Sequence, residues 1–404
     1  MFDYPARSPS GGERAVLVQL DFGEPDLAER LEELRLLTES AGGVISAEIT
    51  GRRHSPDPRT FSGKGKTEEI AAACRACRAE LVIFNHLLSP AQERNLERLL
   101  ECRVVDRTRL ILDIFALRAQ SAEGKLQVEL AQLEHLSTRL VRGWSHLERQ
   151  RGGIGLRGPG EKQLETDRRL LNKRVRLLKE RLDRLSRQRS VQRKARQKSE
   201  TLNVSLAGYT NAGKSTLFNA LTHAEVYVAD QLFATLEATS RRLWLPGAER
   251  GHIVLSDTVG FIRDLPHPLV EAFQATLEAT ADADLILHVV DSASPARDEQ
   301  IAEVNQVLAE IGAADTPQIL VWNKVDLTGV SPTIERDDCD RIRRVKLSAR
   351  TGMGLELLRE ALTEKAREKT ARRMTTVLAG FDPSSEAPKP EPLSPNNLSG
   401  KHLS

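Results

Sequence analysis

The strongest constraint on the fold of this 404-residue chain is an eight-residue stretch from Gly208 to Ser215. The apolar run Val204–Ala207 precedes it, and the helix-like stretch Thr216–Leu221 follows it. A strand, a glycine-rich loop and a helix in this order form a phosphate-binding loop, because glycines let backbone N–H groups and the helix N-terminus surround phosphate oxygens. We expect all eight residues to contact a nucleotide: Gly208, Tyr209, Thr210, Asn211, Ala212, Gly213, Lys214 and Ser215.

A second motif adds the residues expected to handle the γ-phosphate and Mg²⁺. It is Asp257-Thr258-Val259-Gly260, at the end of a strand of buried type that begins at Ile253. Asp257 would hold Mg²⁺ through a water molecule, and the Gly260 N–H would sense the γ-phosphate. In the first loop, Lys214 would reach the β- and γ-phosphates and Ser215 would bind Mg²⁺ directly.

A third motif indicates that the base is guanine. Asn323-Lys324-Val325-Asp326 follows the apolar run Ile319–Trp322. The Asp326 carboxylate can accept hydrogen bonds from both N1–H and the 2-amino group of guanine, whereas adenine offers neither donor there. Losing such a pairing can discriminate between bases by on the order of 10⁴-fold. The run Val345–Leu347 is followed by Ser348, Ala349 and Arg350. We expect backbone N–H groups of these three residues to donate to guanine O6.

The order of these motifs predicts the fold of the third part of the chain. Each motif alone occurs by chance on surface turns, but here each follows a strand-like run and the order is that of Ras-like GTPases. Residues 202–370 are therefore predicted to form a P-loop GTPase domain of the α/β class. Its ligands should lie at the carboxyl ends of a doubly wound sheet.

A switch segment must supply a threonine to Mg²⁺ when the γ-phosphate is present. The best candidate region lies between the phosphate loop and Asp257, and it holds two threonines, Thr235 and Thr239. We favour Thr235, which makes Lys214, Thr235 and Gly260 the residues expected to act on hydrolysis. The residues of this segment expected near the nucleotide are Phe233, Ala234, Thr235, Leu236 and Glu237.

Two further positions bear on the rate of hydrolysis. Ras-like enzymes use a glutamine just after the second motif to orient the attacking water, but this chain has Phe261 there. A phenyl ring cannot orient water by hydrogen bonding, so we expect slow intrinsic turnover that an external factor must accelerate. Asn211 is similar to the asparagine by which several GTPases bind a charge-neutralising K⁺. We therefore expect Mg²⁺ as a cofactor, and K⁺ as a second candidate.

The N-terminal part of the chain has the pattern of a smaller α/β domain, which we place at residues 14–118. Short β-branched runs such as Ala15–Leu20 and Val44–Ile49 alternate there with helix-like stretches such as Asp26–Leu37. Cys74 and Cys77 form a Cys-x-x-Cys pair inside a helical pattern. No second pair follows, so packing within a helix is a better interpretation than zinc binding.

Residues 119–200 have two stretches with heptad spacing, which predicts an antiparallel coiled-coil hairpin. A segment at 151–160 with five glycines and a proline separates them and is expected to form the tip of the hairpin. From Arg151 to Lys198 there are 17 basic and 5 acidic residues, a local charge of +12, whereas the whole chain carries only +2. This asymmetry favours contact with a polyanion, although a solvated basic helix would have the same composition.

The composition excludes several other classes of protein. Four scattered cysteines cannot cross-link a chain of this length, which favours a reducing compartment. The first residues lack the pattern of a signal peptide, and no apolar run approaches the roughly 20 residues of a membrane span. We expect a cytoplasmic protein. The last segment, 380–404, is rich in proline and serine and is predicted to be disordered.

Taken together, the motifs resemble one family, the HflX GTPases. The resemblance spans about residues 14 to 370 and depends most on the glycine-rich segment that begins at Arg151; the other matching segments are Gly63–Lys66, Asp167–Arg169, Gly208–Ser215, Phe233–Leu236, Asp257–Gly260 and Asn323–Asp326. It implies that the hairpin enters the large ribosomal subunit near the peptidyl-transferase centre. It also implies a role in splitting, rescue or assembly of ribosomes. Two features depart from the family pattern. One is Glu237, and the other is the expected disordered tail, which stands where some relatives have a folded C-terminal domain.

Three alternatives remain open at this level. The sequence Ile154-Gly155-Leu156-Arg157-Gly158 matches the loop of a KH domain, which would make the chain an assembly GTPase that acts as a nucleotide-dependent RNA-binding scaffold. A KH loop, however, joins short helices, whereas long heptad stretches flank this one. A coiled coil that dimerises a scaffold is the second alternative, but an intramolecular hairpin predicts a monomer. An ATP-driven RNA remodeller, the third, conflicts with Asp326.

Overall fold

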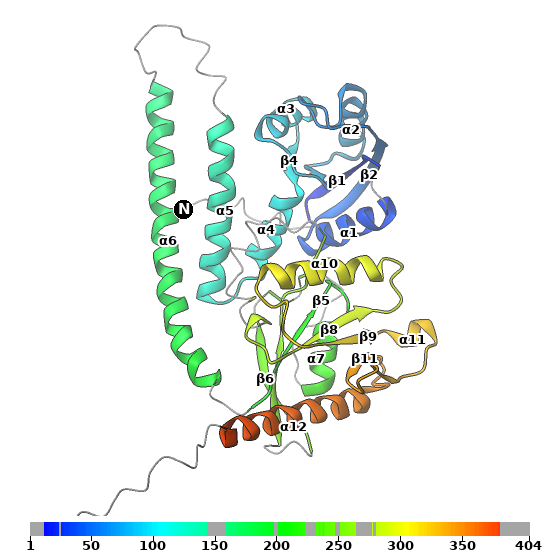
Figure 1. The fold of residues 1–404 in the computed structure, drawn as a ribbon. Coiled ribbons are helices and arrows are strands. Elements are labelled where there is room, and N and C mark those ends of the chain that lie inside the picture. Colours follow the sequence, from blue (N-terminus) through cyan, green and yellow to red (C-terminus); the bar gives the residue numbers. More distant parts are fainter. Residues whose placement is uncertain are drawn as a thin grey trace, which may run out of the picture.

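The computed structural model contains a parallel sheet of four strands and a mixed sheet of seven strands, joined by a long helical hairpin (Figure 1). The structure describes residues 12–23, 26–143, 159–197, 201–222, 232–233, 235–236, 238–246, 251–263, 277 and 280–379. Residues 151–158 of the hairpin tip predicted at 151–160, and the predicted tail at 380–404, lie outside these residues. None of the helices in the described ranges is both long and apolar enough to cross a bilayer.

The N-terminal domain has a four-stranded parallel sheet in the order β2-β1-β3-β4. Its strands are β1 (Arg14–Asp21), β2 (Val44–Arg52), β3 (Leu81–Phe84) and β4 (Arg103–Asp106). Its helices are α1 (Leu27–Ser40), α2 (Lys64–Cys77), α3 (Pro90–Leu100) and α4 (Arg107–Arg118). Both faces of β1 are buried, which explains the consecutive apolar residues Ala15–Val18 in the sequence. Cys74 lies on α2 and packs in one of the two cores of this domain.

The hairpin consists of α5 (Ala122–Gly143) and α6 (Pro159–Gln197), which lie side by side (Figure 1). Leucines at heptad positions form its core, and Leu130 and Leu133 of α5 cluster with Leu171 and Leu178 of α6. The predicted tip is wrong at its last two residues, because α6 already begins at Pro159. Proline is well tolerated at the first position of a helix, where its missing N–H would have no helical partner.

The GTPase domain has a seven-stranded sheet in the order β10-β11-β9-β8-β5-β7-β6. Its strands are β5 (Asn203–Gly208), β6 (Thr239–Trp244), β7 (His252–Asp257), β8 (Leu285–Asp291), β9 (Gln318–Asn323), β10 (Ile334–Arg336) and β11 (Ile342–Lys346). Its helices include α7 (Lys214–Thr222), α10 (Arg297–Glu310), α11 (Val325–Thr328) and α12 (Leu355–Ala379). Residues of α7 and α12 share one apolar cluster with the strands, while α10 packs on the other face, as expected for a doubly wound α/β domain.

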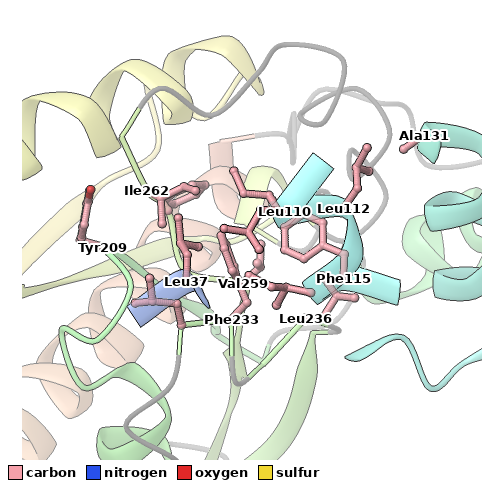
Figure 2. Packing of buried hydrophobic residues seen from close by; sticks show 14 of the residues in the cluster. Leu37, Leu110, Leu112, Phe115, Ala131, Tyr209, Phe233, Leu236, Val259 and Ile262 are labelled. Carbon is pink, nitrogen blue, oxygen red and sulfur yellow. The ribbon is translucent and has the colours of Figure 1, made fainter. Parts of the chain in front are cut away.

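The two domains share one hydrophobic core (Figure 2). Phe115 of α4 packs edge-to-face on Phe233, with 4.7 Å between ring centroids and 80° between ring planes. Leu37 and Leu110 of the N-terminal domain belong to the same cluster as Val259 of the second motif. The segments that surround the phosphate loop are therefore packed directly against the other domain.

The hairpin core generates a prediction about stability. Leu178→Ala removes a fully buried side chain from α6 and should cost about 2–5 kcal/mol of local stability, by lost burial and the cavity left behind. Hydrogen exchange of α5 and α6 should accelerate while GTP affinity stays unchanged. Leu177→Ala, one residue away and 43% exposed, is the matched control and should leave the exchange nearly unaltered. Equal effects of the two substitutions would contradict this packing.

Candidate nucleotide site

The phosphate loop connects β5 to α7 and is held by close backbone contacts that only glycine permits. Gly208 has φ 150°, and a Cβ atom there would lie 2.2 Å from the carbonyl oxygen of Val289. Gly213 has φ 96°, and its Cβ would lie 2.2 Å from Nδ2 of Asn323. The two glycines are therefore required by steric fit to β8 and to the guanine motif, in addition to any approach of phosphate.

Lys214 places a buried cation at this loop. Its Nζ donates hydrogen bonds to the carbonyl oxygens of Gly208 (3.0 Å) and Tyr209 (2.8 Å). Burial lowers the pKa of this amine to about 8, and the nearby Asp257 carboxylate opposes that shift. An ammonium group with little access to water interacts strongly with an incoming phosphate, since the local dielectric constant is low.

Three oxygen-bearing side chains from separate segments meet next to the lysine. Ser215 Oγ donates to Asp257 Oδ2 at 2.6 Å, and Thr235 Oγ1 donates to the same oxygen at 3.1 Å. The two hydroxyl oxygens are 2.9 Å apart. Thr239 is the first residue of β6, where the register places it opposite Asp257, but among the described residues its hydroxyl forms no hydrogen bond with this cluster.

This cluster fits a magnesium ion. Asp257 Oδ1 is buried and has no hydrogen-bond partner among the described residues, so a cation would satisfy it. Burial raises the pKa of Asp257, which the hydrogen bonds from Ser215 and Thr235 oppose. Hydroxyl and carboxylate oxygens are the ligands that Mg²⁺ prefers. Ser215, Thr235 and Asp257 would hold the ion, which when bound neutralises charge on the phosphates.

The second motif lies directly on the phosphate loop. Gly260 is so close to it that a Cβ atom would lie 2.7 Å from Thr210 Cγ2 and 2.9 Å from Lys214 Nζ. The next residue pairs with the loop through its backbone: Phe261 N–H donates to Gly208 O at 3.2 Å, and Thr210 N–H donates to Phe261 O at 2.7 Å. Gly260 is thus placed where its N–H can meet a γ-phosphate.

Several residues in or next to the predicted site have side chains buried in the core, so that only their backbone could face a nucleotide. Tyr209, Phe233, Leu236, Val259 and Phe261 are all buried in the core shared by the two domains. The hydroxyl of Thr258 is also occupied, because it donates to Leu206 O at 2.6 Å. The Phe261 ring is only 1% exposed, so this position offers no side chain that could orient water. Ala234 and Glu237 lie outside the described residues.

The guanine motif is tied to the phosphate loop by one side chain. Asn323 Nδ2 donates to Ala212 O at 2.8 Å, and Asn323 Oδ1 accepts from the Ala349 N–H at 2.9 Å. Lys324 forms an ion pair with Asp291 at 2.7 Å. The Asp326 side chain follows in α11 and is exposed.

The segment 348–350, which is expected to close over the base, already forms hydrogen bonds within the protein. Ser348 N–H donates to Met353 O at 2.8 Å, and the Ala349 N–H is held by Asn323. A contact from Ala349 to guanine O6 would therefore have to share or replace the bond to Asn323. Arg350 is exposed at the end of this segment.

Sequence reasoning missed a polar network that connects the site to the N-terminal domain. The Tyr209 hydroxyl donates to Glu33 at 2.8 Å and accepts from the Arg263 N–H at 2.8 Å. The Arg263 side chain is 8% exposed and reaches Glu29 at 3.3 Å, while Arg107 donates to Arg263 O at 2.9 Å. Glu33 and Tyr209 are 176 positions apart, and no local pattern links them.

Comparisons with known proteins match this chain to GTPases along most of its length. Three family models match: the GTP-binding GTPase N-terminal model at residues 28–116, the GTP-binding GTPase middle region at 118–196, and the 50S ribosome-binding GTPase model at 203–324. GTPase HflX of Escherichia coli is 58% identical over 88% of this chain and 83% of its own length. GTPase HflX of Caldanaerobacter subterraneus is 46% identical over 89% of this chain and 82% of its own length.

One solved structure supports the fold. The crystal structure of SsGBP in complex with GDP superposes with a TM-score of 0.51 at 24% identity. It covers 88% of this chain and 99% of the other. At this identity the likeness bears on the fold alone, and it spans the N-terminal domain, the hairpin and the GTPase domain.

The base site leads to a prediction about specificity. Asp326→Asn replaces two acceptor oxygens by an amide that presents a donor, so the preference for GTP over xanthosine triphosphate should fall by several orders of magnitude, up to on the order of 10⁴. Competition binding with the two nucleotides measures the change. Asp338→Asn, at another exposed aspartate of this domain, should retain the preference. An unaltered preference in the Asp326 variant would exclude this carboxylate from base recognition.

The metal cluster leads to a second prediction. Thr235→Ala should lower Mg²⁺-dependent GTP hydrolysis by at least about 10-fold, the loss typical of a weakened metal site, while GDP affinity changes little. Thr239→Ala is the control, because that threonine lies opposite Asp257 in β6 but does not hydrogen-bond to the cluster within the described residues. Single-turnover kinetics over a Mg²⁺ titration separate weaker metal binding from slower chemistry. A larger loss in the Thr239 variant would reverse our assignment of the switch threonine.

Proposed function

Because the chain belongs to the HflX family of GTPases, we propose that it binds the large ribosomal subunit and couples GTP binding and hydrolysis to ribosome splitting, rescue or assembly. The match of residues 203–324 to the 50S ribosome-binding GTPase model supports this partner. So do the HflX relatives, which this chain matches over most of both lengths. The nucleotide site supplies the hydrolytic part of the function.

The observation that carries the ribosomal part is the exposed basic surface of α6. Only one side of this helix packs on α5, through Leu171, Leu178 and their neighbours. The remaining surface is exposed and carries cations from Arg168 through Arg187. Each cation that meets a phosphate releases condensed counterions, so such a surface favours RNA strongly at low salt. The glycine-rich segment at 151–158 connects α5 to α6 and would approach RNA most closely.

Within the GTPase domain, the residues have distinct roles in hydrolysis. The Lys214 ammonium and the backbone N–H groups of the phosphate loop would bind the β- and γ-phosphates, and the Gly260 N–H would detect the γ-phosphate. Thr235 would bind Mg²⁺ only when the γ-phosphate is present, and so would respond to the same phosphate. No described side chain occupies the position of a water-orienting glutamine, because Phe261 is buried in the shared core. We infer that the ribosome, or a part of it, completes the site.

A second candidate function keeps the partner but changes the use of GTP. In this alternative the chain is an RNA-binding scaffold for ribosome assembly, and GTP acts as a ligand that sets its conformation. The two functions differ in turnover on the ribosome, which the main proposal requires to rise. Both are compatible with a monomer, since the hydrophobic seam of the hairpin is filled within one chain. Light scattering measures the molar mass in solution and so tests whether the protein is a monomer.

The main proposal predicts a dependence on the hairpin tip. Purified large subunits should stimulate GTP turnover of the unmodified protein. Replacing Gly152, Gly153 and Gly155 by alanine and both Arg151 and Arg157 by glutamate should remove this stimulation, because the backbone can no longer approach RNA and the new charges repel phosphate. GTP affinity in the absence of ribosomes is the control and should not change. Full stimulation of the variant would show that the segment is a linker.

We also propose K⁺ as a cofactor, on the position of Asn211 alone. This residue lies in the phosphate loop with φ 60°, and its side chain is exposed beside the phosphate positions. A monovalent cation bound there would neutralise charge that develops in the transition state. Turnover should be faster in KCl than in NaCl at equal ionic strength, and Asn211→Ala should abolish the difference. Equal rates of the unmodified protein in both salts would refute the idea.

A further inference from the structure

The free edge of the large sheet carries an unusual set of side chains. β6 is the last strand of the seven, and among the residues that the structure describes it pairs with β7 alone. Its sequence, Thr-Ser-Arg-Arg-Leu-Trp, contains two arginines and no acidic residue. Trp244 is 67% exposed, more than any other tryptophan among the described residues, and Arg241 and Arg242 are exposed as well.

The Trp244 ring is held in place although it is exposed. Gly251, across the turn between β6 and β7, has φ 68°, and a Cβ atom there would lie 2.3 Å from Cζ3 of the indole. The six-membered part of the ring therefore rests against the backbone of Gly251, which only glycine allows. The Leu245 N–H closes the turn with a bond of 2.9 Å to Gly251 O. A ring fixed on one side and open on the other loses little entropy when a ligand stacks on it.

A cation stands next to this ring on the same face. Side chains two positions apart in a strand point to the same side, so Arg242 and Trp244 lie about 7 Å apart along β6. Arg242 forms no ion pair with the residues that the structure describes, and its cross-strand neighbour is Val254. Its guanidinium is therefore available to a partner from outside.

A flat aromatic face beside an unpaired guanidinium matches single-stranded nucleic acid. An unpaired base can stack on the indole while the guanidinium meets the adjoining phosphate. A peptide that extended the sheet at this edge would leave the exposed indole and both arginines without a chemical role. We propose that β6 is a second RNA-binding surface, on which an unpaired nucleotide of single-stranded RNA stacks on Trp244 with Arg242 on its phosphate.

This surface adds to the proposed function and rests on it only in the choice of RNA as partner. It lies on the GTPase domain, whereas the proposed ribosome contact lies on the hairpin. The two can therefore fail separately. A free oligonucleotide tests the surface without ribosomes.

The experiment uses the fluorescence of Trp244 in the full-length protein. Trp144→Phe together with Trp322→Phe leaves Trp244 as the sole indole, and GTP binding verifies that this variant is folded. Adding an unstructured 12-nucleotide oligouridylate should quench its emission in a saturable manner that salt reverses. Introducing Trp244→Ala into the otherwise unmodified protein should weaken the binding of the same labelled oligonucleotide by about 5- to 150-fold, the range for one stacked base.

A matched pair of charge variants tests the phosphate contact. Arg242→Gln, in the variant with Trp244 alone, should reduce the slope of log affinity against log salt by about one, because one cation is removed. Arg343→Gln, an exposed arginine on β11 at the far side of the sheet, should not change the slope for quenching. An equal change in both variants would contradict a local contact.

Two outcomes would overturn the proposal. The labelled oligonucleotide could bind the protein without any change in Trp244 emission, which would assign its binding to the hairpin. Alternatively, an unstructured peptide of no net charge could quench Trp244 as fully as RNA does, which would make the edge a peptide-binding surface. If RNA quenches Trp244 but large subunits fail to stimulate turnover, the proposed function fails and this surface stands.

Discussion

The contact between Phe115 and Phe233 fixes the geometry on which the nucleotide site depends. Phe233 has φ 57°, a left-handed conformation that costs a bulky residue about 1–3 kcal/mol. Burial of its ring in the shared core offsets that cost. The same anchoring sets the position of Thr235 two residues later, beside Ser215 and Asp257. The arrangement of these three side chains in the GTPase domain therefore relies on a helix of the N-terminal domain.

Polar contacts reinforce this dependence at a second point. Arg263 follows the second motif and is enclosed by Glu29 from α1 and Glu303 from α10. These charges raise its pKa, against the effect of burial, so the guanidinium stays charged inside the interface. Removing both of these carboxylates would leave the buried guanidinium poorly compensated, which is more costly than losing an ion pair at the surface. The interface between the two domains thus combines an apolar core with charged groups that fit only one relative position of the domains.

Sequence reasoning identified the fold class and the chemistry because both depend on local patterns. Phosphate needs a glycine-rich loop before a helix, and guanine needs a carboxylate after a strand, so the motifs around Lys214 and Asp326 could be recognised without a structure. Heptad spacing indicated the hairpin for the same reason. The start of α6 at Pro159 was missed, since a proline after a run of glycines suggests a continuing loop. The roles of Phe261 and Tyr209 were out of reach, because the partners of their side chains lie in another domain and far away in the chain.

The length of α6 has a mechanical consequence. A helix of 39 residues is about 58 Å long, and the chain continues from its C-terminal end to β5, an interior strand that ends at the phosphate loop. Lys369 of α12 secures this junction by donating to Thr201 O at 3.0 Å, next to its ion pair with Asp284. A rotation of roughly 5° at the base would move the far end of such a rigid arm by about 5 Å, nearly one helical turn. Sub-ångström rearrangements around a phosphate are small compared with that displacement, so an arm of this length would amplify any rotation that such rearrangements cause at its base.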